Sequence, residues 1–564
     1  MICTLVLGSV TLIAQDAQQT YPVHGTVLDS VTRQPIARAL VDSHSQGATL
    51  TDNDGHFEFN LTAGSADLLV RRPGYEPMTG SLHSHRVQVG PSTPELTFTL
   101  TPEALITGQV TLSTADPADG IRVIAYRHHL VNGRMQWAMQ STATTNSEGI
   151  FRIARLQAGE YLLYTESARG RDGPAIPGAK TFGYPPVYYP GTADSASSAV
   201  LTLTAGQHAQ ADFALTRQRY YTVSFTVSDP RAAARTSFEI RDAAGHATGF
   251  PVRWDAMQGI VQATVPNGHY YLEANSGNVR AAFSVNFSVR LTGDSGQTYG
   301  RTDFTVANAP LIGLPLTLFP LRPIPVNIHK DFTASSSSNT AQLSDLSGAP
   351  IDLSSGLSLS LVSGEEFLGQ GNVSGQPRPL PGTNDGTSFE FSGASPGRYW
   401  VATSAFQGYV SSITSGGVDL AREPLTIGPG GASASIEVTL RNDTGTITGQ
   451  IKSPASTGST LDSQAGAAPG EQPHIQIYAV PLFSYSGQLQ QAYAQSGGQF
   501  TIPSLAPGSY RVLAFDAPQE IDFHTPEGLA KYTGKGQTVT VEAGGTAGAQ
   551  IEVITNDDAE AAQP

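Results

Sequence analysis

Cysteine is nearly absent from this sequence, since Cys3 is the only thiol in 564 residues. One thiol excludes an intramolecular disulfide and any metal site built from several cysteines, so the domains must be held by their hydrophobic cores. Basic clusters are also scarce, because the net charge is −15 at pH 7 and the longest basic run is Arg71-Arg72. The phosphates of nucleic acids and of anionic lipids would be repelled by such a chain, so we expect neither as a partner.

Long hydrophobic runs are limited to Ile2–Ala14, a 13-residue apolar segment followed by the polar QDAQQ. This run is too short to span a bilayer and is typical of the h-region of a signal peptide, with cleavage after Ala14. A first core strand is the alternative, because no Lys or Arg precedes the run. We expect residues 1–20 to be signal peptide and leader. The mature chain would have no membrane span and would be exported to the periplasm, the outer cell surface or the extracellular space.

Helical periodicity is weak, whereas turn-forming residues are abundant, with 59 glycines and 37 prolines. Many short strands joined by turns are the expected result. Hydrophobic residues make up 39% of the chain and charged residues 14%, a balance too apolar for a disordered protein. The length exceeds what one hydrophobic core can organise and indicates several domains.

One phrase recurs along the chain. It consists of a turn rich in Gly, Asx or Ser, two apolar residues one apart, and a Gly five or six places later. The clear copies are TDNDGHFEFNLTAG (Thr51–Gly64), TTNSEGIFRIARLQAGEYLLY (Thr144–Tyr164), TNDGTSFEFSGASPGRYWVA (Thr383–Ala402) and SGGQFTIPSLAPGSYRVLAF (Ser496–Phe515). The last three also place an aromatic residue two positions after the Gly. A degenerate fifth copy is IVQATVPNGHYYLEA (Ile260–Ala274).

The second copy shows how we interpret the phrase. Phe151 and Ile153 alternate with other residues in the period of two that turns one strand face toward a core. Gly159 permits a tight turn with positive φ, and Tyr161 and Leu163 then resume the alternation. The phrase therefore predicts a β-hairpin.

Each copy lies between an opening strand with its own Gly (VHGTVLD, ITGQVTL or ITGQIKS) and a closing strand such as LTFTL or IEVTLR. About seven short strands in a unit of roughly 100 residues predict a two-sheet sandwich. The predicted fold class is all-β, a tandem array of about five Ig-like or transthyretin-like antiparallel β-sandwich domains. We place them at residues 21–102, 103–217, 218–321, 322–442 and 443–555, followed by a disordered acidic tail at 556–564. Their short connections predict a semi-rigid rod.

Residues 21–101 carry a more specific pattern. It runs Val23-x-Gly25-x-Val27, Thr32, Pro35-Ile36, Ala39, Val41, Thr51-Asp52-x-Asp54-Gly55-x-Phe57-x-Phe59 and Gly74-Tyr75. This pattern resembles the carboxypeptidase regulatory-like domain, a transthyretin-like sandwich. The second and fifth units resemble it with longer turns, and the third and fourth only in the repeated phrase. The resemblance also implies a fold similar to carbohydrate-binding modules, which does not by itself assign a function.

Motifs for catalysis are lacking. Metallocarboxypeptidases hold zinc with His-x-x-Glu and a downstream His, but no His follows His524-x-x-Glu527, so we interpret that segment as a loop. His83-x-His85 and His128-His129 have no third ligand nearby, and the Asn and Asp of DNDG (Asp52–Gly55) suit a turn better than a calcium site. We find no nucleophile elbow, P-loop or dinucleotide motif. The prediction is no catalytic residue, no metal, no cofactor and no enzyme.

Binding through aromatic side chains is the leading alternative to catalysis, because sugars stack on flat rings exposed on a rigid sandwich. Trp400 takes the outward slot of its strand, so it is either a ligand platform or a contact with a neighbouring domain. Tyr184, Tyr188 and Tyr189 in YPPVYYPG form a second candidate, with a stiff loop packed on its own sandwich as the alternative.

These observations predict an exported, non-catalytic binding or structural module at the cell envelope, with carbohydrate as the leading ligand class. A protein–protein scaffold or adhesin accessory to an outer-membrane system is the alternative, and an enzyme with an interdomain site ranks third. The expected partner is a polysaccharide or a cell-envelope protein.

Overall fold

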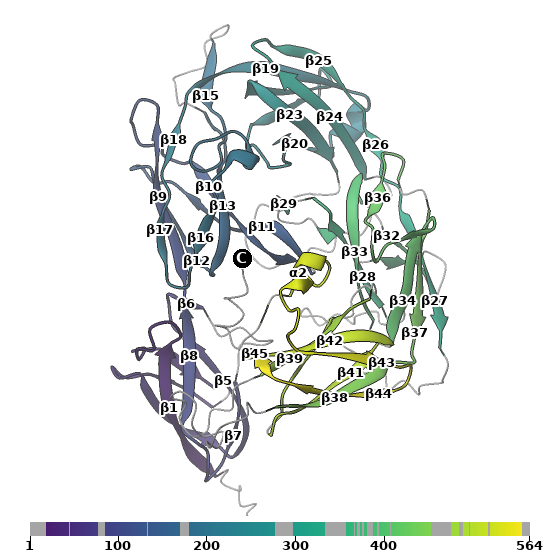
Figure 1. The fold of residues 1–564 in the computed structure, drawn as a ribbon. Helices are drawn as coiled ribbons and strands as arrows, with labels where there is room; N and C mark the ends of the chain where they lie inside the picture. The colour runs from purple at the N-terminus through teal and green to yellow at the C-terminus, as the bar shows by residue number, and fades with distance from the viewer. Residues whose placement is uncertain are drawn as a thin grey trace, which may run out of the picture. The chain divides into compact units, whose positions relative to one another are not determined.

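The protein is described by a computed structural model (Figure 1) that divides into two compact units, unit 1 ending at Glu103 and unit 2 beginning at Ala104. The structure describes residues 19–43, 46–76, 85–131, 133–169, 180–276, 297–332, 357–365, 367–368, 373–374, 377–380, 387–391, 394–405, 408–431, 434–452, 475–483, 489–495, 497–516, 519 and 521–554. The predicted signal segment, His83, residues 333–356 (a Ser-rich stretch that we interpret as an insertion in the fourth unit) and the acidic tail lie outside the described residues.

The all-β prediction is confirmed. Helices in the described ranges are limited to α1 (Pro230–Ala233), α2 (Pro526–Ala530) and the 3-10 turn η1 (Ser195–Ser197). Five large hydrophobic cores, each enclosed by its own pair of sheets, are built from residues 23–100, 104–215, 220–316, 324–440 and 447–551. The first core lies in unit 1 and the other four in unit 2.

The first sandwich (purple in Figure 1) pairs the sheets β4-β1-β8-β6 and β3-β2-β5-β7. Its strands are β1 (Thr20–Asp29), β2 (Leu40–Asp42), β3 (Ala48–Leu50), β4 (His56–Thr62), β5 (Gly64–Arg71), β6 (Tyr75–Glu76), β7 (His85–Val89) and β8 (Leu96–Pro102).

The second sandwich has one sheet in the order β12-β9-β17, with β18 also on β9, and a second in the order β16-β13-β10-β11-β29. The strands are β9 (Ala104–Leu112), β10 (Arg122–Val131), β11 (Arg134–Thr144), β12 (Ile150–Leu156), β13 (Gly159–Thr165), β16 (Leu201–Leu203), β17 (His208–Gln210), β18 (Phe213–Leu215) and β29 (Phe367–Leu368).

The third sandwich combines β14-β15-β19-β22-β21, with β25 on β19, and β20-β23-β24-β26. The strands are β14 (Ala168–Arg169), β15 (Thr181–Tyr184), β19 (Gln218–Val227), β20 (Ser237–Asp242), β21 (Val252–Asp255), β22 (Ile260–Pro266), β23 (Gly268–Asn275), β24 (Thr298–Val306), β25 (Leu311–Leu316) and β26 (Phe319–Pro320).

The fourth sandwich combines β31-β32-β27-β37-β34-β35 with β30-β28-β33-β36. The strands are β27 (Ile324–Asp331), β28 (Leu357–Ser363), β30 (Val373–Ser374), β31 (Arg378–Pro379), β32 (Ser388–Phe391), β33 (Gly397–Ala405), β34 (Tyr409–Ser415), β35 (Val418–Asp419), β36 (Leu425–Ile427) and β37 (Ile436–Arg441).

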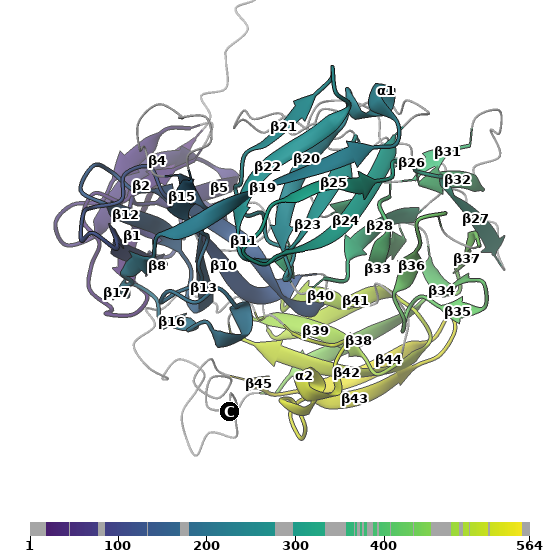
Figure 2. The same cartoon turned by 90° about the horizontal axis from the view of Figure 1, so that it is seen from above.

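The fifth sandwich, drawn in yellow-green and yellow in Figures 1 and 2, combines β41-β38-β44 with β40-β39-β42-β43, and β45 pairs with β42. The strands are β38 (Gly445–Ile451), β39 (Gln476–Pro481), β40 (Gln490–Tyr493), β41 (Gln499–Leu505), β42 (Gly508–Phe515), β43 (Gln537–Val541), β44 (Thr546–Ile551) and β45 (Val553–Ile554).

All five sandwiches share one closing arrangement, in which a late strand pairs in parallel with the opening strand. The pairs are β1 with β8, β9 with β17 and β18, β19 with β25, β27 with β37, and β38 with β44. A parallel pair needs a long crossover, here the whole intervening sandwich, so the two ends of each domain are fixed side by side.

The repeated phrase is not a hairpin, and that prediction is wrong. In the second sandwich β12 pairs with β9, whereas β13 pairs with β10 and β16 in the opposite sheet. The chain therefore crosses from one sheet to the other. Its register shifts after Ile153, Arg155 adopts a φ of 60°, and Gly159 a φ of 144°. Alternation alone could not separate the two arrangements, because both turn Phe151 and Tyr161 toward one core.

The aromatic residue after the Gly holds this crossing in place. The hydroxyl of Tyr161 donates to the carbonyl of Gln157 at 2.8 Å, and the hydroxyl of Tyr510 donates to that of Ala506 at 2.8 Å. Tyr399 makes the same bond to a carbonyl four residues earlier, that of Ser395, at 2.9 Å. Such a bond satisfies a carbonyl that the bend removes from the sheet, as in the tyrosine corner of other sandwiches. The repetition therefore builds a corner.

The Gly of the opening strand serves the same architecture. A Cβ at Gly108 would meet the carbonyl of Ala211 on the parallel closing segment and the ring of Phe151. Gly449 is enclosed in the same way by Ala549 and Phe500. The glycine leaves room for the phenylalanine of the repeated phrase, so the two residues recur together.

Unit 2 is not the rod that its short connections predicted. Trp137 of β11 pairs in parallel with Phe367 of β29, a strand that completes the sheet of the second sandwich but lies in the sequence between β28 and β30 of the fourth. The amide of Gln136 donates to the carbonyls of Ser363 at 3.2 Å and Glu365 at 3.0 Å. The long β10–β11 hairpin therefore joins sandwiches that are not consecutive in the chain, and its tip at Gly133 lies against Phe523 and His524 of the fifth sandwich.

Candidate binding site

Trp400 lies on β33 with its side chain away from the core, as the alternation predicted, because its neighbour Val401 is in the core. The indole is half-buried, and the guanidinium carbon of Arg134 lies 3.4 Å from the centre of its ring. Burial lowers the pKa of Arg134, against the opposing charge of Asp522. Trp400 thus contacts the second sandwich, which was the alternative to an open platform.

The three tyrosines of YPPVYYPG point in two directions. Tyr184 is 6% exposed within the second core, and Tyr189 packs edge-on against Phe213 with ring centres 5.6 Å apart. Tyr188 is 1% exposed and lies on the opposite side of its sheet. Ring faces buried in this way favour a loop packed on its own sandwich over an exposed platform.

Tyr188 instead joins a buried polar cluster with the third sandwich. Its hydroxyl donates to Oδ2 of Asp242 at 2.7 Å and also contacts Nδ1 of His246. Although burial alone would raise it, the pKa of Asp242 is lowered by hydrogen bonds from His246 and Tyr188. Burial and the charge of Asp242 raise the pKa of Tyr188.

Aromatic rings enclose this cluster. The His246 imidazole is 2% exposed, with the rings of Phe367 and Tyr126 centred 4.2 and 4.7 Å away. Nε2 of His246 and the hydroxyl of Tyr164 are buried and have no hydrogen-bond partner among the residues that the structure describes. A carboxylate, an imidazole and a phenol converge here as in a proton relay, but the rings block a substrate. The arrangement fits a joint between the second, third and fourth sandwiches.

The histidine motifs have local contacts. His128 stacks on Trp137 and its Nδ1 lies 3.0 Å from Glu160. His524 precedes α2, so the segment predicted as a loop begins a short helix, and the side chain of Glu527 is outside the described part. Asp52 Oδ1 accepts the backbone N–H groups of Asp54 and His56, as a turn requires.

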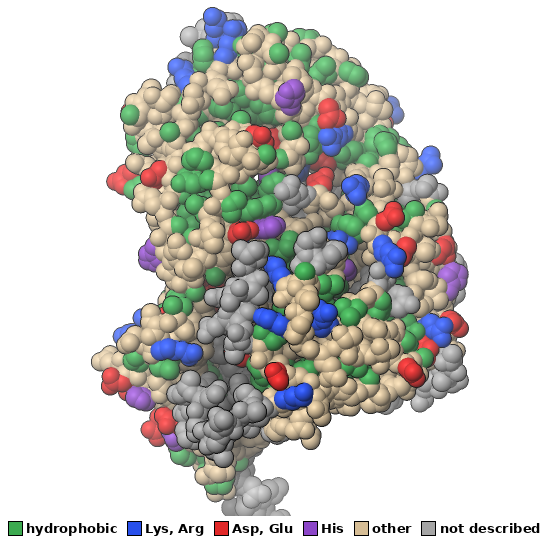
Figure 3. Space-filling model, viewed as in Figure 1, with side chains coloured by type: hydrophobic (Ala, Val, Ile, Leu, Met, Phe, Trp, Pro, Cys, Tyr) green, Lys and Arg blue, Asp and Glu red, His purple; other side chains and the backbone are tan. Residues whose placement is uncertain are grey.

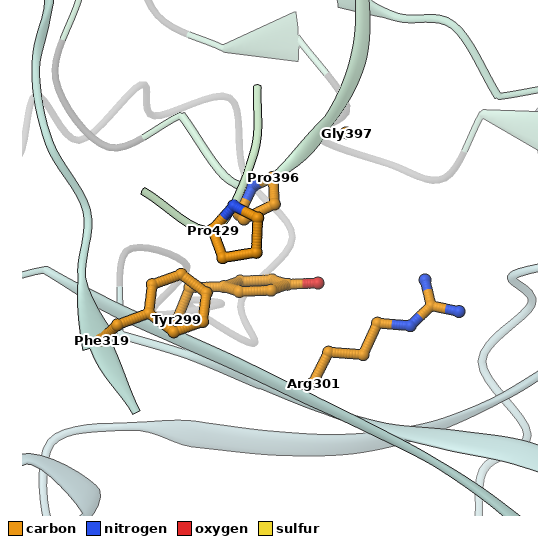
Figure 4. A pocket seen from close by; sticks show the side chains of 6 residues that line it. All are labelled: Tyr299, Arg301, Phe319, Pro396, Gly397 and Pro429. Carbon is orange, nitrogen blue, oxygen red and sulfur yellow. The ribbon is translucent and has the colours of Figure 1, made fainter. Parts of the chain in front are cut away.

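A pocket of about 300 Å³ lies between the third and fourth sandwiches (Figure 4). Its lining comes from β24 and β26 on one side and from the corner before β33 and the turn after β36 on the other. The lining residues are Tyr299, Arg301, Phe319, Pro396, Gly397 and Pro429.

The pocket has an apolar end and a polar end. The rings of Tyr299 and Phe319 are centred 5.7 Å apart, and Pro429 lies over the Tyr299 ring in Figure 4. The Tyr299 hydroxyl points toward the side where the Arg301 side chain extends (Figure 4). Flat apolar faces beside hydrogen-bond donors suit a ligand that has an apolar face and a polar edge.

Arg301 connects the pocket to a network of charges. Its guanidinium makes two bonds to Asp303, at 2.8 and 3.3 Å, and its carbon lies 3.8 Å from the centre of the Tyr271 ring. Beyond it, Arg241 forms ion pairs with Glu239 at 2.6 Å and Glu273 at 2.7 Å.

Comparison with known families fits this fold. Residues 22–101 match the family model of the carboxypeptidase regulatory-like domain. This match confirms, for the first sandwich, the resemblance that its sequence motif had indicated. No curated protein matches the sequence.

Pilins and a collagen-binding protein are among the solved structures similar to the chain. The Bacillus anthracis TIE protein is 12% identical, with 53% of this chain and 51% of that chain covered and a TM-score of 0.16. This chain thus spans about half of that relative. A streptococcal ancillary pilin is 11% identical over 54% of this chain and 100% of its own, with a TM-score of 0.18. Two B repeats of the Staphylococcus aureus collagen-binding protein are 11% identical, covering 80% and 99%, with a TM-score of 0.14. Scores this low carry no argument about function.

The pocket was not predicted from the sequence. Tyr299, Arg301 and Asp303 alternate on one face of β24, a pattern of aromatic and paired charges on an outward face that the sequence displays. The opposing prolines come from the fourth sandwich, so their proximity depends on packing that one sequence does not reveal.

None of the helices in the described ranges is long and apolar enough to cross a membrane.

Proposed function

We propose that this chain is an exported, non-catalytic binding and structural protein with carbohydrate as its leading ligand class. We place the binding site in the pocket between the third and fourth sandwiches. The observation that carries the proposal is the pairing of the Tyr299 and Phe319 rings with the guanidinium of Arg301 around a space of about 300 Å³. A sugar presents C–H groups to a ring and hydroxyl groups to donors at its edge, so it matches both ends of the pocket.

The surrounding structure supports a rigid site. The pocket walls belong to two sandwiches that the Asn275 side chain links, by donating to the Ser395 hydroxyl at 3.1 Å. The corner before β33 is fixed in turn by the bond from Tyr399 to the Ser395 carbonyl. A wall that is already ordered loses little entropy when a ligand binds.

The direct test is binding of the full chain to a glycan array and to insoluble polysaccharides. We expect saturable binding to one glycan class and a loss of affinity of about fivefold in Phe319→Ala, since a ring contact contributes about 1 kcal/mol. Trp400→Ala is the matched aromatic variant, on β33 but not among the residues that line the pocket. Binding weakened by Trp400→Ala and not by Phe319→Ala would move the site to Trp400, and no glycan binding at all would reject the proposal.

A further inference from the structure

The charges around the pocket bear on which saccharide it accepts, an inference that rests on the proposed function. Two guanidinium groups, those of Arg241 and Arg301, stand against four carboxyl groups. The carboxyl groups belong to Glu239, Glu273, Asp303 and Glu365. When all are ionised, the cluster carries two more negative charges than positive ones.

The guanidinium of Arg301, which lines the pocket, is already paired with a carboxylate. Nε and Nη2 of Arg301 both bind Asp303, in the two-pronged geometry that gives the strongest pairing of guanidinium and carboxylate. The plane of the group also lies over Tyr271. Arg301 retains N–H groups that can donate to hydroxyl oxygens, but its charge is offset by a neighbour that a ligand carboxylate would have to displace.

The fourth sandwich adds a further carboxyl group to the same region. Glu365 Oε2 and the Tyr271 hydroxyl both lie within 3.6 Å of a Cβ built on Gly245, so both face the same part of the third sandwich. Burial and the charge of Glu273 raise the pKa of Glu365, in spite of Arg241 and Arg301. Burial is the larger cause, because it disfavours the ionised form of the acid, and a ligand carboxylate buried in the same surroundings would meet the same penalty.

Scattered surface charge does not offset this local excess. On the face of the molecule shown in Figure 3, Lys and Arg side chains are dispersed among acidic ones and do not gather into a basic patch. The chain as a whole carries a net charge of −15. An anionic ligand would therefore gain little from long-range attraction.

We propose that the pocket lined by Tyr299, Arg301 and Phe319 selects uncharged saccharides and rejects those that carry carboxylates. Arg301 donates there to hydroxyl groups of the saccharide, while the Asp303 carboxylate offsets the positive charge of its guanidinium. The selection arises from the surplus of carboxyl groups around the two guanidinium groups.

The test compares polysaccharides that share a backbone and differ in charge. The pairs are hydroxyethyl cellulose with carboxymethyl cellulose, and methyl-esterified pectin with the same pectin after removal of the esters. Affinity gel electrophoresis of the full chain gives a dissociation constant for each. For any pair that binds, we expect the dissociation constant of the acidic member to be at least fivefold higher than that of the neutral member. In 0.5 M salt we expect a smaller ratio of these two constants, because salt screens the repulsion.

Two variants separate charge from shape. Asp303→Asn removes the carboxylate that pairs with Arg301, so the ratio of the acidic to the neutral dissociation constant should fall at least twofold. Asp54→Asn makes the same change of charge on the first sandwich and should leave that ratio unchanged. Equal or tighter binding of the acidic member by the unmodified protein would overturn the inference and leave the proposed function standing. A ratio that Asp303→Asn does not alter would also overturn it. If neither member of any pair binds and the glycan array is empty, the proposed function fails first.

Discussion

The outward faces of β5 and β13 occupy the same place in two copies of one motif, yet their surroundings differ. In the first sandwich, Asp67 and Arg71 of β5 are exposed. In the second, Leu162 of β13 is 3% exposed and Tyr164 is 1% exposed, in a cluster that includes Phe367 of β29. The inward residues of both strands form cores of the same kind. The motif thus fixes the interior of a sandwich, and the outward positions decide whether a second layer covers it.

The largest expected effect comes from replacing matched outward residues. Leu162→Asn should lower the free energy of unfolding of unit 2 by about 3 kcal/mol, because the new amide would be buried without partners and the apolar packing of the leucine would be removed. Asp67→Asn at the equivalent exposed position should change stability by under about 0.5 kcal/mol. All three tryptophans lie in unit 2, so urea unfolding followed by their fluorescence measures the stability of Leu162→Asn. Hydrogen exchange of the β5 amides measures the stability of Asp67→Asn. Equal small effects would mean that the outer face of β13 is open in solution.

The second prediction uses the half-buried imidazole of His524, where the fifth sandwich meets the β10–β11 hairpin. Burial and the charge of Arg134 lower the pKa of His524 from 6.5 to about 4. Because the unfolded chain takes up a proton at higher pH, folding loses stability as pH falls from 6.5 and the loss stops near 4. We expect about 2 kcal/mol less stability at pH 5 than at pH 7 from this residue. His524→Gln should remove that part of the pH dependence in urea titrations, and an unchanged profile would contradict the burial.

The third prediction addresses the tyrosine corner, which the first copy of the motif lacks because Ala66 stands two residues after its Gly. Tyr510→Phe removes the donor to the Ala506 carbonyl and leaves a buried acceptor unpaired. A loss of about 1–2 kcal/mol is expected for the fifth sandwich. Hydrogen exchange of β41 and β42 measures it, with Tyr493→Phe as the control, since Tyr493 is 48% exposed. If both variants behaved alike, the hydroxyl would have no role in the corner.

The same contrast shows what the sequence could predict. Alternation identified the inward residues, so the sandwich class and the inward positions of Phe151, Phe391 and Phe500 followed from local pattern. The crossing between sheets did not, because a hairpin and a crossing give the same alternation. A signal for the covered face was present, however. The unbroken apolar run Tyr161–Tyr164 is the pattern of a strand buried on both faces.

The candidate site was harder to predict for a physical reason. Trp400 was assigned correctly to the outward face from its own strand. What it contacts depends on Arg134, which is distant in sequence and reaches it only because β10 and β11 are long. The pocket around Arg301 likewise needs Pro396 and Pro429 from another sandwich. Local pattern gives the direction of a side chain, and the partner follows from the packing of whole domains.

The smallest expected effect tests that contact at Trp400. A guanidinium over a half-buried indole contributes about 1 kcal/mol, and Arg134 lies 3.4 Å from the ring centre. The single variants Arg134→Met and Trp400→Leu and their combination form a double-mutant cycle, in which Met keeps the aliphatic stem of the arginine. We expect a coupling energy of about 1 kcal/mol in urea unfolding of unit 2. Additive effects would show that the two sandwiches are not joined there, and Trp400 would then be open to a ligand. A coupled pair instead leaves the indole as part of the joint, which is why glycan binding should respond to Phe319→Ala more than to Trp400→Ala.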